Sequence, residues 1–532
     1  MENVKKKKKK KRKEREVQMT GSEEMKTSTE TEKVTKRLVH RFLEMTAPKY
    51  NSAAKYNYNP ANCYKDRIRL CIFIVSVLCS FYILYLYTSS EMKEPNDRSS
   101  LNYTMPWFKI PRKDDDKIQL DQIEESSFGV HFVPPNDVFI PPDWSEEEMK
   151  YLPCLSRKCV CGYFKGKWKN ESCIVRKGVK LQRAYRQEIR TLSDEKRKRW
   201  EKMLNDLKAS GVFSRLARNH KYSGVHAGPA FLLWHREFLK RAELIYRKHM
   251  GPEDINMGVP YWDSSLDWPL PTPKHSIFFS KFLVGEVDED GLVKNGPYHN
   301  WTTIEGRPQI LRQFDKVEEG ELLNDARIKW LIKNPDIDMI FGASRPLVTC
   351  SNKKHLDPRM FELSHNYVHF FVNGDMASSH GASNDILFYL HHSMMDWVLE
   401  FWRRNMQTRQ QRESIYPVSD PNCYPMWHFA ESFMPMLPPF TNRMGLSNGY
   451  TDEMYEFAPR PTCTKQKPDC GSNYLFCYVP SNQQESPYCI SKVRLGGNCT
   501  GFEDHPVCFE AKCLRNPDAE NEFSCQEKIL NA

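Results

Sequence analysis

The chain has 532 residues, more than one ordinary domain requires, and its 40% hydrophobic and 12% aromatic content excludes a mainly disordered protein. Its formal net charge of +10 would suit a polyanionic partner such as nucleic acid or an anionic membrane surface. The charge is concentrated, however, because residues 1–69 hold 20 basic and 9 acidic side chains, whereas residues 70–532 together carry −1. The basic character therefore belongs to an N-terminal tail, and we expect no nucleic-acid partner.

An apolar segment follows this tail. Residues 1–69 begin with a lysine run and continue rich in Ser, Thr and Glu, so we predict a basic, disordered tail. Residues 70–87 contain no charged residue, glycine or proline and are just long enough to span a bilayer as a helix. They lie too far from Met1 for a cleaved signal peptide. We therefore predict a transmembrane signal anchor at 70–88. The positive-inside rule then places the tail in the cytoplasm and the remainder outside it, as in a single-pass type II membrane protein.

Sequons and cysteines agree with this orientation. Four Asn-X-Ser/Thr sequons follow the predicted anchor and predict a glycoprotein: Asn102, Asn170, Asn300 and Asn498. Fourteen of the 17 cysteines also follow it, in clusters that lack the histidine partners of a zinc site, which indicates disulfides in an oxidising compartment. The distribution of these cysteines divides the chain after the anchor into four segments. They are a linker or stalk at 89–150, a Cys-rich flank at 151–180, a domain at 181–460 with few cysteines and a Cys-rich C-terminal segment at 461–532. The pairing within the last segment cannot be read from the sequence.

Helical patterns dominate the region 181–460 and predict a mainly α fold with long loops. Ser193 is a typical N-cap for a helix that Gly211 would end. Three further helices are predicted near 229–248, 361–371 and 386–404, the last capped by Asn384 or Asp385.

Two histidines of the 361–371 helix form the first candidate site. His365 and His369 are four residues apart and therefore share one helix face. Taken alone, such a pair is more often a surface or core feature than a metal site. A zinc-protease interpretation fails because Asn366, and not a glutamate, follows the first histidine.

The next helix carries the adjacent pair His391 and His392. Adjacent residues are about 100° apart around a helix, so only one of the two can complete a three-imidazole site with the first pair. Asp396 lies four residues beyond His392 on the same face, where it could orient an imidazole from behind.

A third group precedes these helices by 130 residues. His226 and His235 would lie on opposite faces of one continuous helix, but Gly228 and Pro229 between them predict a loop followed by a new helix. His226 is then in the loop and His235 in the helix, and His220 at the end of the preceding helix can converge with them.

Six imidazoles without a thiolate or carboxylate suit copper, zinc or iron rather than magnesium or calcium. Two three-histidine groups on facing helices of a bundle would hold two ions a few ångströms apart. A di-iron site is disfavoured because carboxylates are missing. The residues therefore favour two copper ions and dioxygen chemistry.

The same stretches resemble the tyrosinase family of type 3 binuclear copper oxidases, most closely the membrane-anchored forms of invertebrates such as nematodes and flatworms. The matching segments are 226–239 (HAGPAFLLWHREFL), 365–376 (HNYVHFFVNGDM) and 383–392 (SNDILFYLHH), and similarity extends over about 150–515. The resemblance implies a four-helix bundle around a dicopper site, two copper ions as cofactors, and phenols and O2 as partners.

Carried over residue by residue, the resemblance also implies a ligand set. His220, His226 and His235 would bind the first copper, and His365, His369 and His392 the second, which leaves His391 as a neighbour. Glu362 and Asn366 would be the catalytic residues that orient a water molecule to deprotonate a monophenol. Gly224 stands where some members have a cysteine that forms a thioether, so none is expected here. Met360 replaces a cysteine of close relatives, so the even count of the remaining cysteines leads us to expect that Cys350 pairs instead with Cys423.

The function implied is a phenol oxidase that hydroxylates monophenols, oxidises catechols to o-quinones, or both, for melanin formation or protein tanning. A catechol oxidase without hydroxylase activity is one alternative. A haemocyanin-like oxygen carrier is a second, disfavoured by the single site, the predicted anchor and the absence of tandem sites. A cell-surface binding protein with a degenerate site is a third, disfavoured because all six ligands are present.

Overall fold

The computed structural model describes residues 144–352, 354, 357–482, 485–516 and 522–527. The predicted tail at 1–69, the signal anchor at 70–88, most of the linker at 89–150 and the sequon at Asn102 lie outside these residues. Within the described part, no helix combines the length and the apolar character that a bilayer span requires. All described residues fall within one compact unit of the chain.

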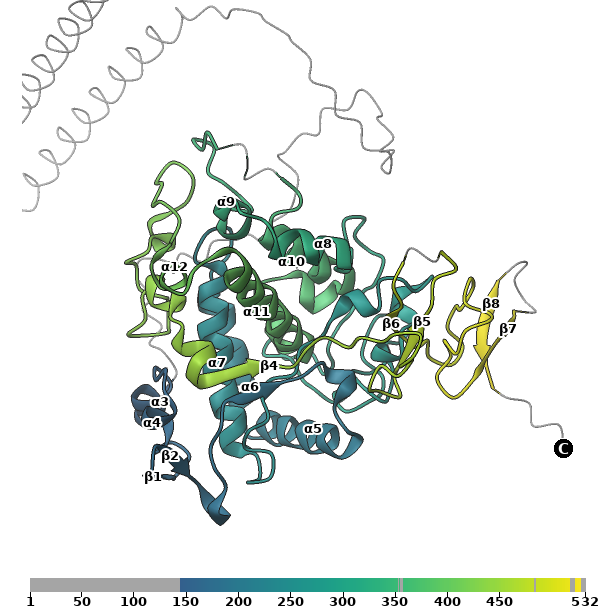
Figure 1. Cartoon of the computed structure of the whole chain (residues 1–532), viewed down its shortest axis with the longest axis horizontal. Coiled ribbons are helices and arrows are strands. Elements are labelled where there is room, and N and C mark those ends of the chain that lie inside the picture. The colour runs from purple at the N-terminus through teal and green to yellow at the C-terminus, as the bar shows by residue number, and fades with distance from the viewer. Residues whose placement is uncertain (1–143, 353, 355–356, 483–484, 517–521, 528–532) are drawn as a thin grey trace, which may run out of the picture. The chain divides into compact units, whose positions relative to one another are not determined.

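The described part is mainly helical, which confirms the predicted fold class (Figure 1). Its α-helices are α3 (Glu146–Tyr151), α4 (Arg157–Val160), α5 (Asp194–Ala209), α6 (Val212–Ser223), α7 (Phe231–His249), α8 (Asp325–Ile332), α9 (Ile337–Phe341), α10 (Phe361–Val372), α11 (Ile386–Met406) and α12 (Arg409–Ser414). The strands are β1 (Lys167–Lys169), β2 (Ser172–Ile174), β3 (Ala184–Arg186), β4 (Tyr455–Phe457), β5 (Leu475–Tyr478), β6 (Tyr488–Ser491), β7 (Lys512–Arg515) and β8 (Phe523–Gln526). They pair two by two, and only β3 and β4 are parallel.

The helix boundaries follow from local chemistry. Ser193 caps α5 by accepting a hydrogen bond from the Lys196 N–H at 3.3 Å, and Gly211, at φ +80°, ends it, as predicted. Asp385 caps α11 through the Leu387 N–H at 3.0 Å. The helix expected from residue 229 begins two residues later, as α7.

The core is centred on α7 and α11, which pack against each other and are buried over most of their length (Figure 1). Their buried faces carry charges as well as apolar side chains. The guanidinium of Arg236 on α7 donates to Asp396 at 2.7 Å and to Glu400 at 3.0 Å, both on α11. Because unpaired charges are too costly to bury, these ion pairs fix which faces of the two helices meet.

The N-terminal end of the described chain packs on this core. Residues 146–150, within the segment expected to be a linker, form most of α3, and Trp144 and Ser145 precede it. Ser145 and Glu148 form a capping box, and the Glu148 carboxylate accepts from Arg215 of α6 at 2.6 Å. The Trp144 indole donates to the carbonyl oxygen of Met436 at 2.7 Å. These contacts explain why the segment is ordered.

All fourteen cysteines that follow the predicted anchor form disulfides, which confirms the predicted cysteine chemistry and the expected partner of Cys350. The pairs are Cys154 with Cys159, Cys161 with Cys173, Cys350 with Cys423, Cys463 with Cys477, Cys470 with Cys489, Cys499 with Cys513, and Cys508 with Cys525.

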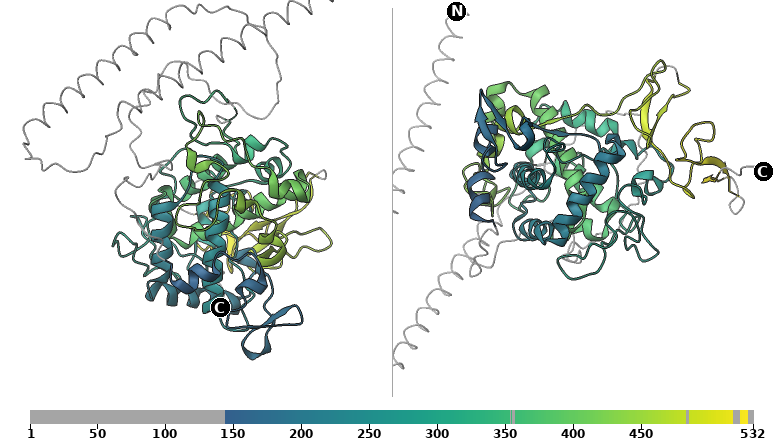
Figure 2. Two further views of the ribbon diagram at one scale, coloured as in Figure 1. Left: turned by 90° about the vertical axis from the view of Figure 1, so that its left-hand side faces the viewer. Right: turned by 90° about the horizontal axis from the view of Figure 1, so that it is seen from below.

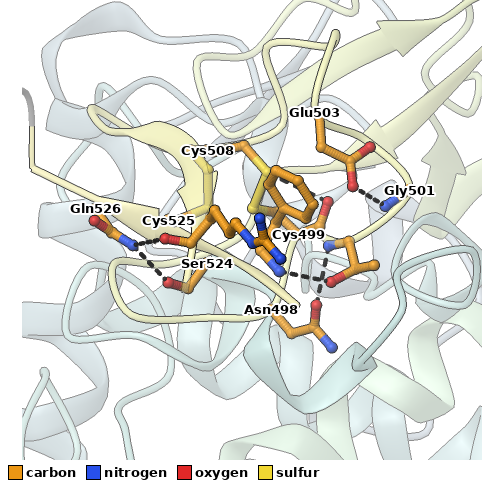
Figure 3. Close-up of a disulfide and its surroundings, with 12 residues drawn as sticks. Asn498, Cys499, Gly501, Glu503, Cys508, Ser524, Cys525 and Gln526 are labelled. Atoms are coloured by element: carbon orange, nitrogen blue, oxygen red, sulfur yellow. Dashed lines mark hydrogen bonds between the residues drawn. A yellow bond between two sulfur atoms is a disulfide. The ribbon is translucent and has the colours of Figure 1, made fainter. Parts of the chain in front are cut away.

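The C-terminal segment contains two copies of one disulfide unit. In each copy the first cysteine pairs with the third and the second with the fourth. The third and fourth lie opposite each other in an antiparallel hairpin, as Cys477 and Cys489 in β5–β6 and as Cys513 and Cys525 in β7–β8. Figure 3 shows the second copy around the disulfide of Cys508. Unequal spacing of the first three cysteines conceals this repeat in the sequence.

The first of these copies is fixed to the helical core. The Arg197 guanidinium on α5 donates to the Tyr474 hydroxyl at 2.9 Å, and the hydroxyls of Ser276 and Ser491 are 2.8 Å apart. The segment extends from one side of the helical body, as the right-hand view of Figure 2 shows.

Candidate metal centre

The first group of histidines comes from α6, the loop after it and α7. His220 lies in the last turn of α6, His226 follows in the loop, and His235 is the fifth residue of α7. One ring nitrogen of each lies within 4.8 Å of those of the other two. The Nε2 atoms of His220 and His235 are 3.3 Å apart. The loop after residue 226 therefore brings His226 close to His235, whereas one continuous helix would place them on opposite faces.

The second group comes from α10 and α11. His365 and His369 share one face of α10, and His392 approaches them from α11, again with ligand atoms within 4.8 Å of one another. The Nε2 atoms of His365 and His392 are 3.1 Å apart. The two groups adjoin, because the rings of His235 and His392 stack with centroids 4.2 Å apart. Four helices, α6, α7, α10 and α11, thus supply five of the six imidazoles.

The opposite ring nitrogens anchor several of these imidazoles. His235 Nδ1 is 2.8 Å from the Phe231 carbonyl oxygen, and His369 Nδ1 is 2.7 Å from that of Met376. A carbonyl accepts only from a protonated nitrogen, so Nε2 of these two rings keeps its lone pair. Such contacts also fix the orientation of the rings, as they do around metals in general.

Burial keeps the imidazoles neutral. Desolvation first, and the neighbouring imidazoles second, hold the pKa values of His220, His235, His365, His369 and His392 well below the usual value. Neutral imidazole is the form that binds a metal ion. Three buried nitrogen lone pairs that converge repel one another, and a cation among them removes this repulsion. The residues therefore fit two ions of a metal that prefers nitrogen ligands, such as copper.

The two predicted catalytic residues lie against this centre. The Glu362 carboxylate, from α10, accepts from the Ala227 N–H at 2.5 Å, and burial raises its pKa to about 7 despite hydrogen bonds to backbone N–H groups. Ala227 has a φ of +66°, an uncommon value for alanine, directly after His226. The Asn366 Oδ1 atom is 2.9 Å from His365 Nδ1. Each residue therefore contacts a metal-ligand candidate or its loop, and the water-orienting role stays a prediction.

His391 and Asp396 have other partners. His391 Nε2 lies 3.3 Å from the His365 carbonyl oxygen, and its ring stacks on that of His365 at 5.0 Å. The Asp396 carboxylate accepts from Arg236 and, at 2.8 Å, from Arg186. The suggestion that Asp396 orients an imidazole is therefore wrong, because its hydrogen bonds go to these arginines and His392 Nδ1 has no hydrogen-bond partner among the described residues.

One buried histidine near the centre, His428, was not predicted from the sequence. His428 follows a proline-rich loop, and its Nδ1 atom accepts from the Ala230 N–H at 3.3 Å, at the start of α7. A Cβ atom on Gly228 would lie 2.8 Å from the His428 ring. His428 therefore supports the loop between His226 and His235 from a segment almost 200 residues away. No residue spacing in the sequence indicates this contact.

Comparisons with known proteins place the site within a described family. Residues 191–405, which contain all six histidines, match the common central domain of tyrosinase. A putative tyrosinase-like protein of Caenorhabditis elegans is 38% identical over 365 residues, which cover 68% of this chain and 50% of that protein. A tyrosinase of Streptomyces galbus is 30% identical over 236 residues, which cover 40% of this chain and 80% of that protein.

Coverage and structural similarity are more limited. The chain spans about half the length of the first two curated relatives, 50% and 58%. A solved polyphenol oxidase of Thermothelomyces thermophila superposes with a TM-score of 0.40 at 15% identity, covering 59% of this chain and 98% of that one.

Proposed function

Because the chain belongs to the tyrosinase family, we propose that it is a copper-dependent phenol oxidase that hydroxylates monophenols, oxidises catechols to o-quinones, or both. The observation that carries this proposal is the pair of adjoining three-imidazole groups. When bound, two copper ions would supply the oxidation of phenols by O2. His220, His226 and His235 would hold one ion, and His365, His369 and His392 the other.

The protein residues have three tasks in this chemistry. Burial excludes bulk water from the six imidazoles and holds the pKa values of His220, His235, His365, His369 and His392 well below the usual value, so that these five are neutral. Carbonyl partners hold Nδ1 of His235 and His369, so that Nε2 faces inward. Glu362 and Asn366 would orient the water that accepts the proton of a monophenol, and the raised pKa of Glu362, about 7, suits a proton acceptor near neutral pH.

Turnover of the copper-loaded protein tests the proposal. The full-length chain in detergent, reconstituted with copper, would be assayed for copper content, O2 uptake and quinone formation from tyrosine and from a catechol. Two copper ions per chain and quinone from both substrates support the full proposal. Quinone from the catechol alone would restrict the protein to catechol oxidation. Reversible oxygen binding without turnover would contradict an enzyme and favour a carrier.

The location of the protein is proposed on the sequence alone. We propose a type II membrane protein anchored by residues 70–88, with a glycosylated catalytic domain outside the cytoplasm, where quinones serve melanin formation or protein tanning. Asn170 and Asn300 are exposed and accessible to glycosylation, whereas the half-buried Asn498 amide donates to Thr272 at 3.3 Å. Protease digestion of membranes from expressing cells tests the topology. Protease added outside should digest the catalytic domain and spare the tail, and digestion of the tail instead would overturn the orientation.

A further inference from the structure

Residues 154–180, here called the basic flank, carry eight basic side chains and one acidic side chain. One of the eight, Arg157, forms an ion pair with Glu453 at 3.1 Å. The other seven are exposed: Lys158, Lys165, Lys167, Lys169, Arg176, Lys177 and Lys180. None of these seven forms an ion pair with another residue that the structure describes. The charge of these seven side chains is therefore not compensated, whereas arginines of the core such as Arg236 are ion-paired.

The fold of the basic flank sets these cations in fixed positions. Lys167 of β1 is paired with Ile174 of β2, and Ile174 is bridged in turn to Lys180. Residues paired across neighbouring strands point to the same face, so Lys167 and Lys180 flank Ile174 about 10 Å apart. Lys169, two residues along β1, shares that face about 7 Å from Lys167. The disulfide between Cys161 and Cys173 ties this small sheet together.

A cavity adjoins this sheet. It has a volume of about 140 Å³ and lies between the flank and the C-terminal end of α7. Lys165, Arg176 and Lys248 line it together with apolar side chains such as Ile255. Lys248 is neutralised by Glu147 at 2.7 Å, whereas Lys165 and Arg176 are among the seven uncompensated cations. The cavity is thus a place where one anionic group could sit between two cations.

Like charges at these separations repel, because 7–10 Å is close to the screening length of about 8 Å at physiological salt. A polyanion relieves this repulsion and releases its own counterions, which favours binding. The short run 165–169, with three lysines in five residues, is of the kind found in nucleic-acid or heparin-binding patches. The proposed location outside the cytoplasm favours a polysaccharide over a nucleic acid.

We propose that the basic flank binds a linear sulfated polysaccharide. Its sulfate groups contact Lys167, Lys169 and Lys180 along the sheet, and one sulfate enters the cavity between Lys165 and Arg176. A flat anionic membrane fits less well, because Trp168, which is 38% exposed, lies opposite Cys173 on the other face of the hairpin from the lysines. A single sulfate group can also enter the cavity between Lys165 and Arg176, which the surface of a membrane cannot do. Figure 1 places β1 and β2 on the opposite side of the helical body from β5–β8. This inference rests on the proposed location outside the cytoplasm but not on the oxidase activity.

Heparin is the probe for the test. All variants are made in the full-length chain with lysines 5–11 changed to glutamine, so that this lysine run does not contribute and the rest of the tail is the same in every variant. The flank variant carries Lys167→Gln, Lys169→Gln and Lys180→Gln. The control variant loses the same charge at exposed positions elsewhere, through Lys196→Gln, Lys198→Gln and Lys465→Gln. The Kd for heparin is measured at several NaCl concentrations, with desulfated heparin and phosphatidylserine vesicles as competitors, and circular dichroism checks folding.

We expect the flank variant to bind heparin at least about tenfold more weakly and the slope of log Kd against log salt to fall by about two to three. The control variant should bind as the parent does, and a Lys167→Arg, Lys169→Arg, Lys180→Arg variant should retain binding because it keeps the charge. Equal weakening in the flank and control variants would overturn the proposal in favour of net charge alone. Competition by desulfated heparin as strong as that by heparin itself would overturn the role of the sulfate groups. Tighter binding of the vesicles than of heparin to the parent would overturn the proposal in favour of a membrane surface.

Discussion

The carboxylate of Glu362 accepts a hydrogen bond from the backbone N–H of Ala227 at 2.5 Å. This contact joins α10, which carries His365 and His369, to the loop that carries His226. The two histidine groups are therefore linked by a buried acid that belongs to neither group. In this position it supports the loop of the first metal site, in addition to the proposed role towards water.

Glu362→Ala should weaken copper binding by the first group. The change leaves the buried Ala227 N–H without an acceptor, at a cost of about 1–3 kcal/mol, and frees a loop held at positive φ. We expect the affinity for one of the two copper ions to fall about 10- to 100-fold, as measured by competition with a chelator. Glu362→Gln is the matched control, because it keeps an acceptor oxygen. Normal copper affinity in the alanine variant would show that the contact is dispensable.

The adjacent histidines of α11 can be distinguished by metal content. His392→Ala should reduce the bound copper from two ions per chain to about one, because His392 contributes a ligand atom to the second group. His391→Ala should leave the content near two, since His391 contacts the His365 carbonyl oxygen instead. Elemental analysis of both variants, after folding is checked by circular dichroism, decides between them. The reverse result would show that His391 is the ligand.

Gly224→Ala should disable the first group selectively. A Cβ atom at this position would lie 2.8 Å from His220 Nε2 and 2.9 Å from the His220 carbonyl oxygen, closer than side-chain carbon atoms come to such neighbours. We expect the imidazole of His220 to be displaced and one copper to be lost. The second group provides the internal control, since its copper should remain. Retention of two copper ions would mean that α6 can shift to make room.

Glu400 should contribute to acid unfolding. Burial by itself would raise its pKa, but the charges of Arg236, Arg403 and Arg404 hold it at about 2, below the ordinary 4.5. Because the folded-state pKa is depressed, the stabilisation is complete above about pH 4.5 and is lost as the pH falls towards 2. Glu400→Gln should flatten the fall in unfolding free energy across this window. It should also cost about 3 kcal/mol at neutral pH, since it leaves buried arginines without their counter-charge.

Asp452 provides the comparison for Glu400. It pairs with Arg409 at the surface, where both side chains are largely exposed. Asp452→Asn should therefore change the unfolding free energy by less than about 1 kcal/mol. Denaturant unfolding at several pH values measures both variants. An equal loss in the two would show that the buried charge network contributes no more than a surface pair.

Several local features of this structure could be predicted from the sequence, because they depend on residues close together in the chain. Caps such as Ser193 and Asp385 fix helix ends through hydrogen bonds to residues two or three positions away. They can therefore be predicted without knowledge of the tertiary structure. The four-residue spacing of His365 and His369 places both on one face of a helix wherever that helix packs. An even number of cysteines after the apolar segment likewise indicated disulfides.

Tertiary structure alone decided the contacts between distant segments. Asp396 is paired with Arg186 and Arg236. Glu362 and His428 both accept hydrogen bonds from the chain between His226 and His235. Such partners are selected by the packing of whole helices and loops, and neither spacing nor composition encodes which side chains will meet. The charge of the whole chain shows the same division. Its sequence placed the excess in the N-terminal tail, but only the fold showed that 154–180 presents seven cations without partners in the described part of the chain.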